Sequence, residues 1–276
     1  MGLPTIHLLF LALAEGLLSP IGATLTSSSP LDRGYRQMYN LEFSDAHRTF
    51  EAYQQDHAAD PLGPTSDAAA YLFDELNRLG VLQTDLFVDD VSFWGRKKPL
   101  PDPEARKKFN EAIARSQKAA LAVLERSPGN RGALLATVMN LGLESDYLAL
   151  VEKRELASLT YTKRAGLMAE KLLATDPTCY DAYLAIGVEN YILGLKPAPV
   201  RWLLRLYGAQ TDKDSGIQKL QLTATKGHYL MPFARLLLAV AALRDKNRSQ
   251  AKELLQNLAQ EFPNNQLYKR ELARLQ

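Results

Sequence analysis

Two short polar clusters interrupt otherwise apolar helical segments, and they hold the side chains of this sequence best suited to chemistry. In the first, residues 140–147, Glu144 and Tyr147 are three positions apart and therefore share one face of a helix. The second cluster consists of three consecutive residues, Glu189, Asn190 and Tyr191. If helix pairs stack in register, both clusters lie near the same end of neighbouring helices and form one polar site that anchors a ligand.

Glu144 and Glu189 also invite a different interpretation, as paired carboxylates for acid–base catalysis. The sequence offers no nucleophile or oxyanion site beside them, so we expect no catalytic residue and a protein that is not an enzyme. A third interpretation is that these groups satisfy one another and the helix ends, as buried polar groups must. The residues alone leave binding and structural roles open.

Motifs that carry a known mechanism are missing from the sequence, among them the phosphate-binding loop, the dinucleotide fingerprint and the zinc-protease helix. Cys179 is the lone cysteine and the four histidines are scattered. We therefore expect no metal site and no cofactor, because helical metal ligands are usually spaced three or four residues apart with carboxylates nearby.

Composition narrows the class of partner. Of the 276 residues, 46% are hydrophobic and 23% are charged, which is enough apolar material for a large core. The formal net charge is only +2, and both signs are interspersed along the chain. Nucleic acid is therefore not an expected partner.

The N-terminal segment resembles a secretory signal. Residues 6–14 form an unbroken apolar run, and small residues follow up to Ala23. We predict a signal peptide over residues 1–23, export to the periplasm or outside the cell, and no integral membrane segment in the mature chain. The alternative is that this segment forms the first helix of a cytoplasmic protein.

Helical periodicity dominates residues 24–276, which we interpret as a single all-α domain. A loop-rich insertion at 80–103 breaks the rhythm with prolines and aromatic residues. The expected helices cover 31–41, 44–58, 66–79, 103–126, 131–151, 155–175, 179–193, 198–206, 214–226, 230–244, 248–261 and 265–275.

A recurring spacing accompanies these helices: a small residue, large residues one and two turns later, and then a proline. A small residue lets two antiparallel helices approach closely, and the proline ends the second helix. The C-terminal copy has Ala251, Leu255, Leu258 and Pro263. The N-terminal copy has Ala46, Phe50, Tyr53 and, one turn late, Pro61.

These features resemble the tetratricopeptide repeat (TPR) superfamily. The best first-helix match follows Pro177, where Tyr183 takes the aromatic place and Ile186-Gly187 the Leu-Gly place. Gly34 fits the glycine place of the first copy. The resemblance implies a superhelical solenoid of antiparallel helix pairs.

The C-terminal half is also weakly similar to the tetratricopeptide repeat protein 39 family. The similarity lies in 199–204, Gly208, 212–217, Leu220 and the helix pair at 230–263. It supports helical repeats and implies no cellular role.

In TPR proteins the first helix of each pair lines a concave face, and this resemblance implies which residues meet a ligand. The repeat at 180 presents Asp181, Leu184, Val188 and Tyr191; the other repeats present Leu31, Tyr35, Met38, Leu135, Met139, Gly142, Phe233, Leu236, Val240 and Leu243. This face is apolar, so these residues either fill the core or hold an apolar helix, peptide or lipid-like ligand. Arg201 and Trp202 are a further candidate anchor, because Arg and Trp are enriched at interface hot spots.

The functional prediction is a non-catalytic TPR-like scaffold that binds a protein or peptide partner in the cell envelope. The alternative is a small-molecule binding or carrier protein with a polar site on its concave face.

Overall fold

A computed structural model describes residues 29–81, 100–195 and 212–275. These residues form eleven α-helices, one π-helical turn and one 3-10 turn, and they include no strand. The elements are α1 (Pro30–Tyr39), α2 (Phe43–Asp56), α3 (Leu62–Arg78), α6 (Pro103–Arg126), α7 (Arg131–Asp146), η1 (Tyr147–Val151), α8 (Glu155–Thr175), η2 (Tyr180–Ala182), α9 (Tyr183–Gly194), α11 (Lys213–Lys226), α12 (Met231–Arg244), α13 (Arg248–Glu261) and α14 (Gln266–Arg274). The all-α prediction is confirmed for the described part of the chain.

Local sequence explains where most of these helices begin and end. The side chain of Ser29 accepts the backbone N–H of Asp32 at 3.1 Å, and the Asp32 carboxylate accepts the N–H of Ser29 in return, which forms a capping box. The side chains of Asn130 and Asp212 accept backbone N–H groups in the first turns of α7 and α11 and so cap these helices. The helices α6, α8 and α13 each end two residues before a proline, as the repeat spacing predicts.

Three boundaries differ from the expected ones by more than two residues, and one of them is the start of the helix expected at 179–193, which begins at Tyr183 after the 3-10 turn η2. The helix expected at 66–79 begins at Leu62, because Pro64 falls in its first turn, where no backbone hydrogen bond is lost. The helix expected at 131–151 changes at Tyr147 into the π-helical turn η1. The predicted signal at 1–23, the helix at 198–206 and residues 82–99 of the insertion lie outside the described residues.

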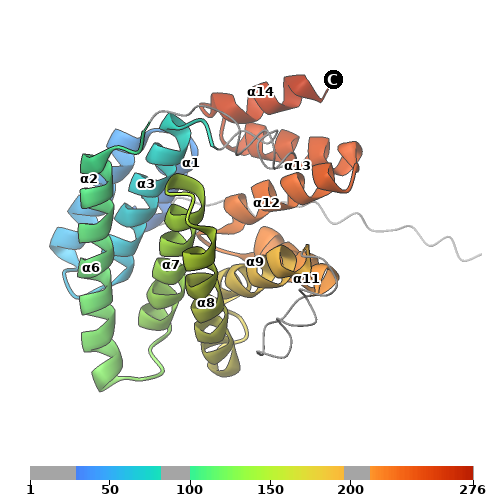
Figure 1. Cartoon of the computed structure of the whole chain (residues 1–276). Helices are drawn as coiled ribbons and strands as arrows, with labels where there is room; N and C mark the ends of the chain where they lie inside the picture. Colours follow the sequence, from blue (N-terminus) through green and yellow to red (C-terminus); the bar gives the residue numbers. More distant parts are fainter. Residues whose placement is uncertain (1–28, 82–99, 196–211, 276) are drawn as a thin grey trace, which may run out of the picture.

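Each described helix packs against the next one along the chain, and α6, α7 and α8 run in alternating directions (Figure 1). Small residues make the close approaches. A Cβ atom at Gly34 of α1 would overlap the Phe50 ring of α2, and Ala46 on that helix is fully buried. Ala251, Leu255 and Leu258 of α13 are likewise at 0% exposure, so the residues of this spacing are buried in both copies.

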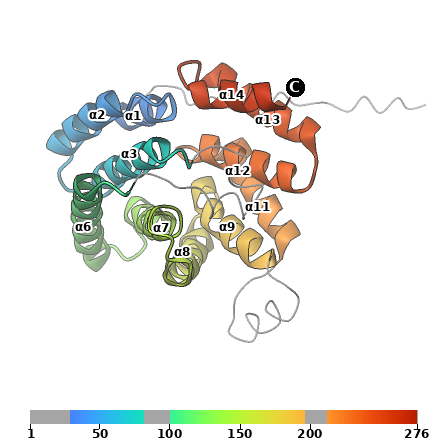
Figure 2. The same ribbon diagram turned by 45° about the horizontal axis from the view of Figure 1, so that its top comes forward.

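The C-terminal helices lie beside the N-terminal ones, so the described chain curves back on itself (Figure 2). The rings of Tyr35 and Tyr229 stack with centroids 4.7 Å apart, and the rings of Phe73 and Phe233 meet edge to face at 5.4 Å. The Asn265 amide donates to the Tyr39 carbonyl at 2.8 Å. These contacts join α1 and α3 to α12 and α14, and they surround an interior space.

Residues 131–151, formed by α7 and η1, are long and apolar enough to span a membrane by length and composition alone. About 61% of the most apolar stretch is buried inside the protein, as in the core helix of a globular fold.

Candidate functional site

The interior of the helical arrangement contains a cavity between α1, α3, α7, α8, α9 and α12. The cavity volume is about 70 Å³, and the cavity opens partly to solvent. Because about 10–15 Å³ of such volume is enough for one water molecule, the cavity has room for several waters or a small organic molecule. Its walls are mostly aromatic and aliphatic side chains, with only four non-aromatic polar residues: Ser145, Asp146, Thr162 and Asp181.

Several residues that the TPR resemblance places on the concave face line this cavity. They include three predicted site residues, Asp181, Leu184 and Val188. Tyr35, Met38, Met139, Gly142 and Phe233 line it as well. The predicted face therefore consists of core residues that leave an internal space between them.

Gly142 marks the open part of the cavity. A Cβ atom built at this helical position would have no other atom within 4 Å. The absence of a side chain here contributes directly to the empty volume.

Asp146 brings a carboxyl group into the apolar cavity at the last residue of α7. Within the part of the chain that the structure describes, no donor or cation pairs with this carboxyl. Burial raises the pKa of Asp146 to about 7, and no charged neighbour opposes that rise. The π-helical turn η1 follows at once, and such turns often occur at functional sites.

The two hydroxyl groups beside Asp146 are already engaged. The Ser145 and Thr162 hydroxyl oxygens are 2.7 Å apart, and each lies 3.1 Å from the Ser158 carbonyl. The two hydroxyl groups have two hydrogens between them, and both are used within these contacts. The pair therefore offers the cavity only acceptor lone pairs.

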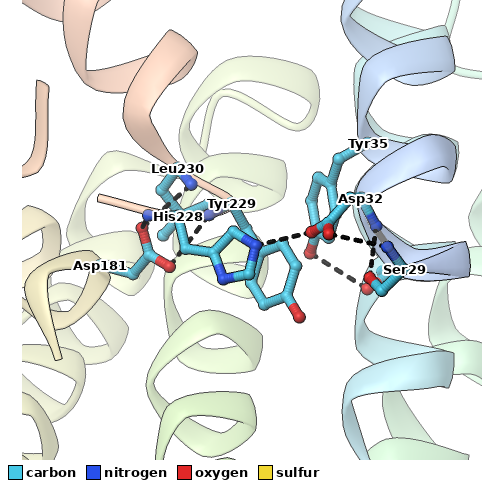
Figure 3. A network of polar contacts seen from close by, with 8 residues as sticks. Ser29, Asp32, Tyr35, Asp181, His228, Tyr229 and Leu230 are labelled. Atoms are coloured by element: carbon cyan, nitrogen blue, oxygen red, sulfur yellow. Dashed lines mark hydrogen bonds and ion pairs between the residues drawn. The ribbon is translucent and has the colours of Figure 1, made fainter. Parts of the chain in front are cut away.

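Asp181 has a structural role that its position in the predicted groove did not indicate. Its carboxylate accepts the backbone N–H groups of His228, Tyr229 and Leu230 at 2.8, 3.0 and 3.1 Å (Figure 3). These bonds hold the turn between α11 and α12 against the start of α9. Burial nevertheless raises the pKa of Asp181, and the three donated hydrogens partly offset that rise.

His228 connects the same turn to the first helix. Its Nε2 atom lies 2.6 Å from a carboxylate oxygen of Asp32, the residue that closes the capping box of α1 (Figure 3). Asp32 is buried, whereas the His228 side chain is 58% exposed. The network therefore joins α1, α9 and α12 at one edge of the cavity.

Glu144 and Tyr147 turn towards α6 and do not line the cavity. Glu144 accepts a hydrogen bond from Gln117 at 3.2 Å, and burial raises its pKa, with Arg164 opposing. The Tyr147 ring stacks on Phe109 with centroids 4.7 Å apart. The predicted pair thus packs between helices α6, α7 and α8.

Glu189 and Tyr191 have other neighbours. A Cβ atom at Gly166 of α8 would overlap the Glu189 carboxyl, and burial raises the pKa of Glu189 to about 7, reinforced by Glu170. Gly216 of α11 packs against the backbone of Tyr191, while Asn190 is buried beside them. Among the described residues, no hydrogen bond or ion pair joins this cluster to Glu144 or Tyr147. The structure therefore does not bring the two clusters into one site.

Arg201 and Trp202 lie outside the described residues. Within 29–81, 100–195 and 212–275, no group of three or more His, Cys, Asp or Glu residues could hold a metal ion. Asp146 is the site residue that sequence reasoning did not single out, although it belongs to the polar run 140–147.

A second hollow lies against α6, α7 and α8 and has different walls. Its lining includes Leu121 and Leu167, whose exposed fractions are 61% and 57%. Two large exposed apolar side chains beside a hollow are typical of a contact surface for another macromolecule.

The fold and the site together define an all-α protein of sequentially packed helices with an apolar cavity at its centre. Comparison with protein-family models, with curated proteins and with solved structures gave no match to this chain.

Proposed function

We propose that this chain is a non-catalytic TPR-like helical repeat protein that binds a small apolar molecule in its central cavity. The sequential helix pairs and the small-residue approaches within them support the solenoid interpretation. The proposal takes up the second of the two predicted functions and moves its site from the polar clusters to the cavity.

The observation that carries the proposal is the cavity itself. Its volume of about 70 Å³ has room for several waters or a small molecule, below the range of about 300–1,000 Å³ of sites for drug-sized ligands. Such sites combine apolar walls with a few polar groups that fix the orientation of the ligand. Natural interiors are otherwise close-packed, so an unfilled space of this size costs stability unless something occupies it.

Gly142→Leu tests the proposal, because the new side chain would extend into the open part of the cavity without meeting another atom at its Cβ. We expect the wild-type protein to bind the apolar dye N-phenyl-1-naphthylamine saturably, with a rise in fluorescence. The Gly142→Leu variant should bind it about tenfold more weakly or not at all, while its helical circular dichroism stays unchanged.

Ala122→Leu is the matched control, because Ala122 is exposed on α6 and gains a similar apolar side chain away from the cavity. It should bind the dye as the wild type does. Equal binding by all three proteins would place the dye elsewhere and contradict the proposal.

A second candidate function is the predicted scaffold, and the exposed leucines beside the outer hollow favour it. Crosslinking of the tagged chain in its native host tests this role. Loss of one stoichiometric partner on Leu167→Ser, with retention on Gly142→Leu, would support a protein partner at the outer hollow. The same preparation, fractionated and sequenced from its N-terminus, tests the proposed export and cleavage after Ala23.

A further inference from the structure

We propose that the ligand of the central cavity is an apolar amine whose protonated nitrogen pairs with the carboxylate of Asp146. This inference rests on the proposed function and specifies the chemical class of the molecule bound there. It follows from which hydrogen-bonding groups of the cavity are still available.

Asp146 differs from the other cavity carboxyl in having unused oxygen atoms. Asp181 accepts three backbone N–H groups within the protein. Asp146 pairs with no donor or cation in the described ranges, and its partly buried side chain lines the cavity. A carboxylate held in apolar surroundings binds a donor strongly, since charge-assisted hydrogen bonds are about twice as strong as neutral ones.

Among the described residues, the remaining polar groups of the cavity offer a ligand at most one hydrogen, that of Tyr35. The hydroxyls of Ser145 and Thr162 are committed to each other and to the Ser158 carbonyl. The Tyr39 hydroxyl donates to the Tyr229 carbonyl at 3.0 Å.

The Tyr35 hydroxyl accepts the Ser66 O–H at 3.1 Å, so its own hydrogen is the one that the described cavity side chains leave for a ligand. No Lys, Arg or His is among the described residues that line the cavity. A ligand head group would therefore meet acceptors at Asp146, Ser145 and Thr162 and one neutral donor at Tyr35.

This arrangement discriminates between head groups. A carboxylate or phosphate would face the Asp146 carboxylate with no compensating cation among the described lining residues, which is strongly unfavourable in an apolar space. An alcohol donates one hydrogen but carries no charge. A protonated amine donates up to three hydrogens and supplies the positive charge that the protein does not place beside Asp146.

The test compares three eight-carbon probes, n-octylamine, n-octanol and octanoate, by calorimetry on the full chain at pH 7.5. Their tails are identical, so differences in affinity report the head group. We expect octylamine to bind about ten- to a hundredfold more tightly than octanol, and octanoate to bind most weakly. In Asp146→Asn, the preference for octylamine over octanol should fall to about twofold or less, with the affinity for octanol unchanged.

Octanoate binding as tightly as octylamine, or an unchanged amine preference in Asp146→Asn, would overturn the assignment of Asp146 while leaving the cavity as an apolar site. Failure of all three probes to bind the wild type would instead refute the proposed function. Asp146→Ala gives a second measure of the same preference, because that residue makes no side-chain hydrogen bond whose loss would unfold the protein.

Discussion

Asp146→Asn should make the protein more stable at neutral and alkaline pH. The wild-type carboxyl must ionise inside the cavity as the pH rises, and its pKa of about 7 records how unfavourable that ionisation is. Asparagine has nearly the same shape and never ionises. The variant should therefore lose the pH dependence that this one group contributes.

The sign follows from linkage. A carboxyl whose pKa is higher in the folded state than in the unfolded chain contributes stability that is fully present below the unfolded pKa, near 4. That contribution is lost as the pH rises through the folded pKa, near 7. A shift of about three pKa units corresponds to about 4 kcal/mol at about 1.4 kcal/mol per unit. Partial solvent exposure of Asp146 reduces this, so we expect a difference of about 2 kcal/mol between pH 5 and pH 8.

Urea denaturation at pH 5 and pH 8 measures this difference directly, provided that both proteins unfold in one transition. The quantity compared is the change in unfolding free energy from pH 5 to pH 8, variant against wild type. Glu189 also titrates near pH 7, but it is present in both proteins and cancels. If wild type and variant lose the same free energy over this pH interval, Asp146 is solvated and the reasoning about the cavity is refuted.

Three further changes test the packing around the cavity, each by urea denaturation at pH 7. Gly34→Ala should destabilise by about 1–3 kcal/mol, because the added methyl group overlaps the Phe50 ring; an unchanged midpoint would contradict the close approach of α1 and α2. Asp181→Asn should lower the unfolding free energy by about 1–3 kcal/mol, since the amide replaces one of the two oxygens that hold residues 228–230. Arg235→Met should cost about 3–5 kcal/mol by leaving the Glu261 charge, 2.7 Å away, without its guanidinium, and a second change of Glu261→Leu should recover most of the loss.

Much of the fold could be predicted because its signals are local. Caps such as Asn130 and prolines such as Pro177 mark helix ends within a few residues of where they act. Small residues such as Gly34 and Ala251 identify the helix pairs, because the partners in each pair are adjacent in the sequence. The stacked rings of Tyr35 and Tyr229 join segments almost two hundred residues apart, and no local sequence pattern predicts this contact.

The candidate site depended on such long-range contacts. Leu184 and Val188 are among the residues that the TPR resemblance predicts to face inward, and both line the cavity. Glu144 stood out in the sequence as a charged residue in an apolar helix, yet it is satisfied by Gln117 of α6. Asp146, two residues away, has no hydrogen-bond donor or cation as a partner among the described residues. The 100° step per residue in a helix places the two on different faces, and only the packing of neighbouring helices decides which face lines the cavity.

An unpartnered carboxyl inside an apolar cavity is destabilising on its own, and this is the strongest argument that the cavity serves a ligand. Asn, Ser or Leu at Asp146 would each avoid an ionisation that costs the folded state about 2 kcal/mol between pH 5 and pH 8. Gly142 lies one turn earlier on the same helix, at a position where a methyl group fits freely. Glycine there has a lower helix propensity than alanine and adds no packing contact. Asp146 lowers stability by adding a charge, and Gly142 lowers it by leaving a space. A cationic apolar ligand that fills the space and neutralises the charge would account for both residues. Bound ligand would then raise the unfolding free energy in proportion to the logarithm of its concentration.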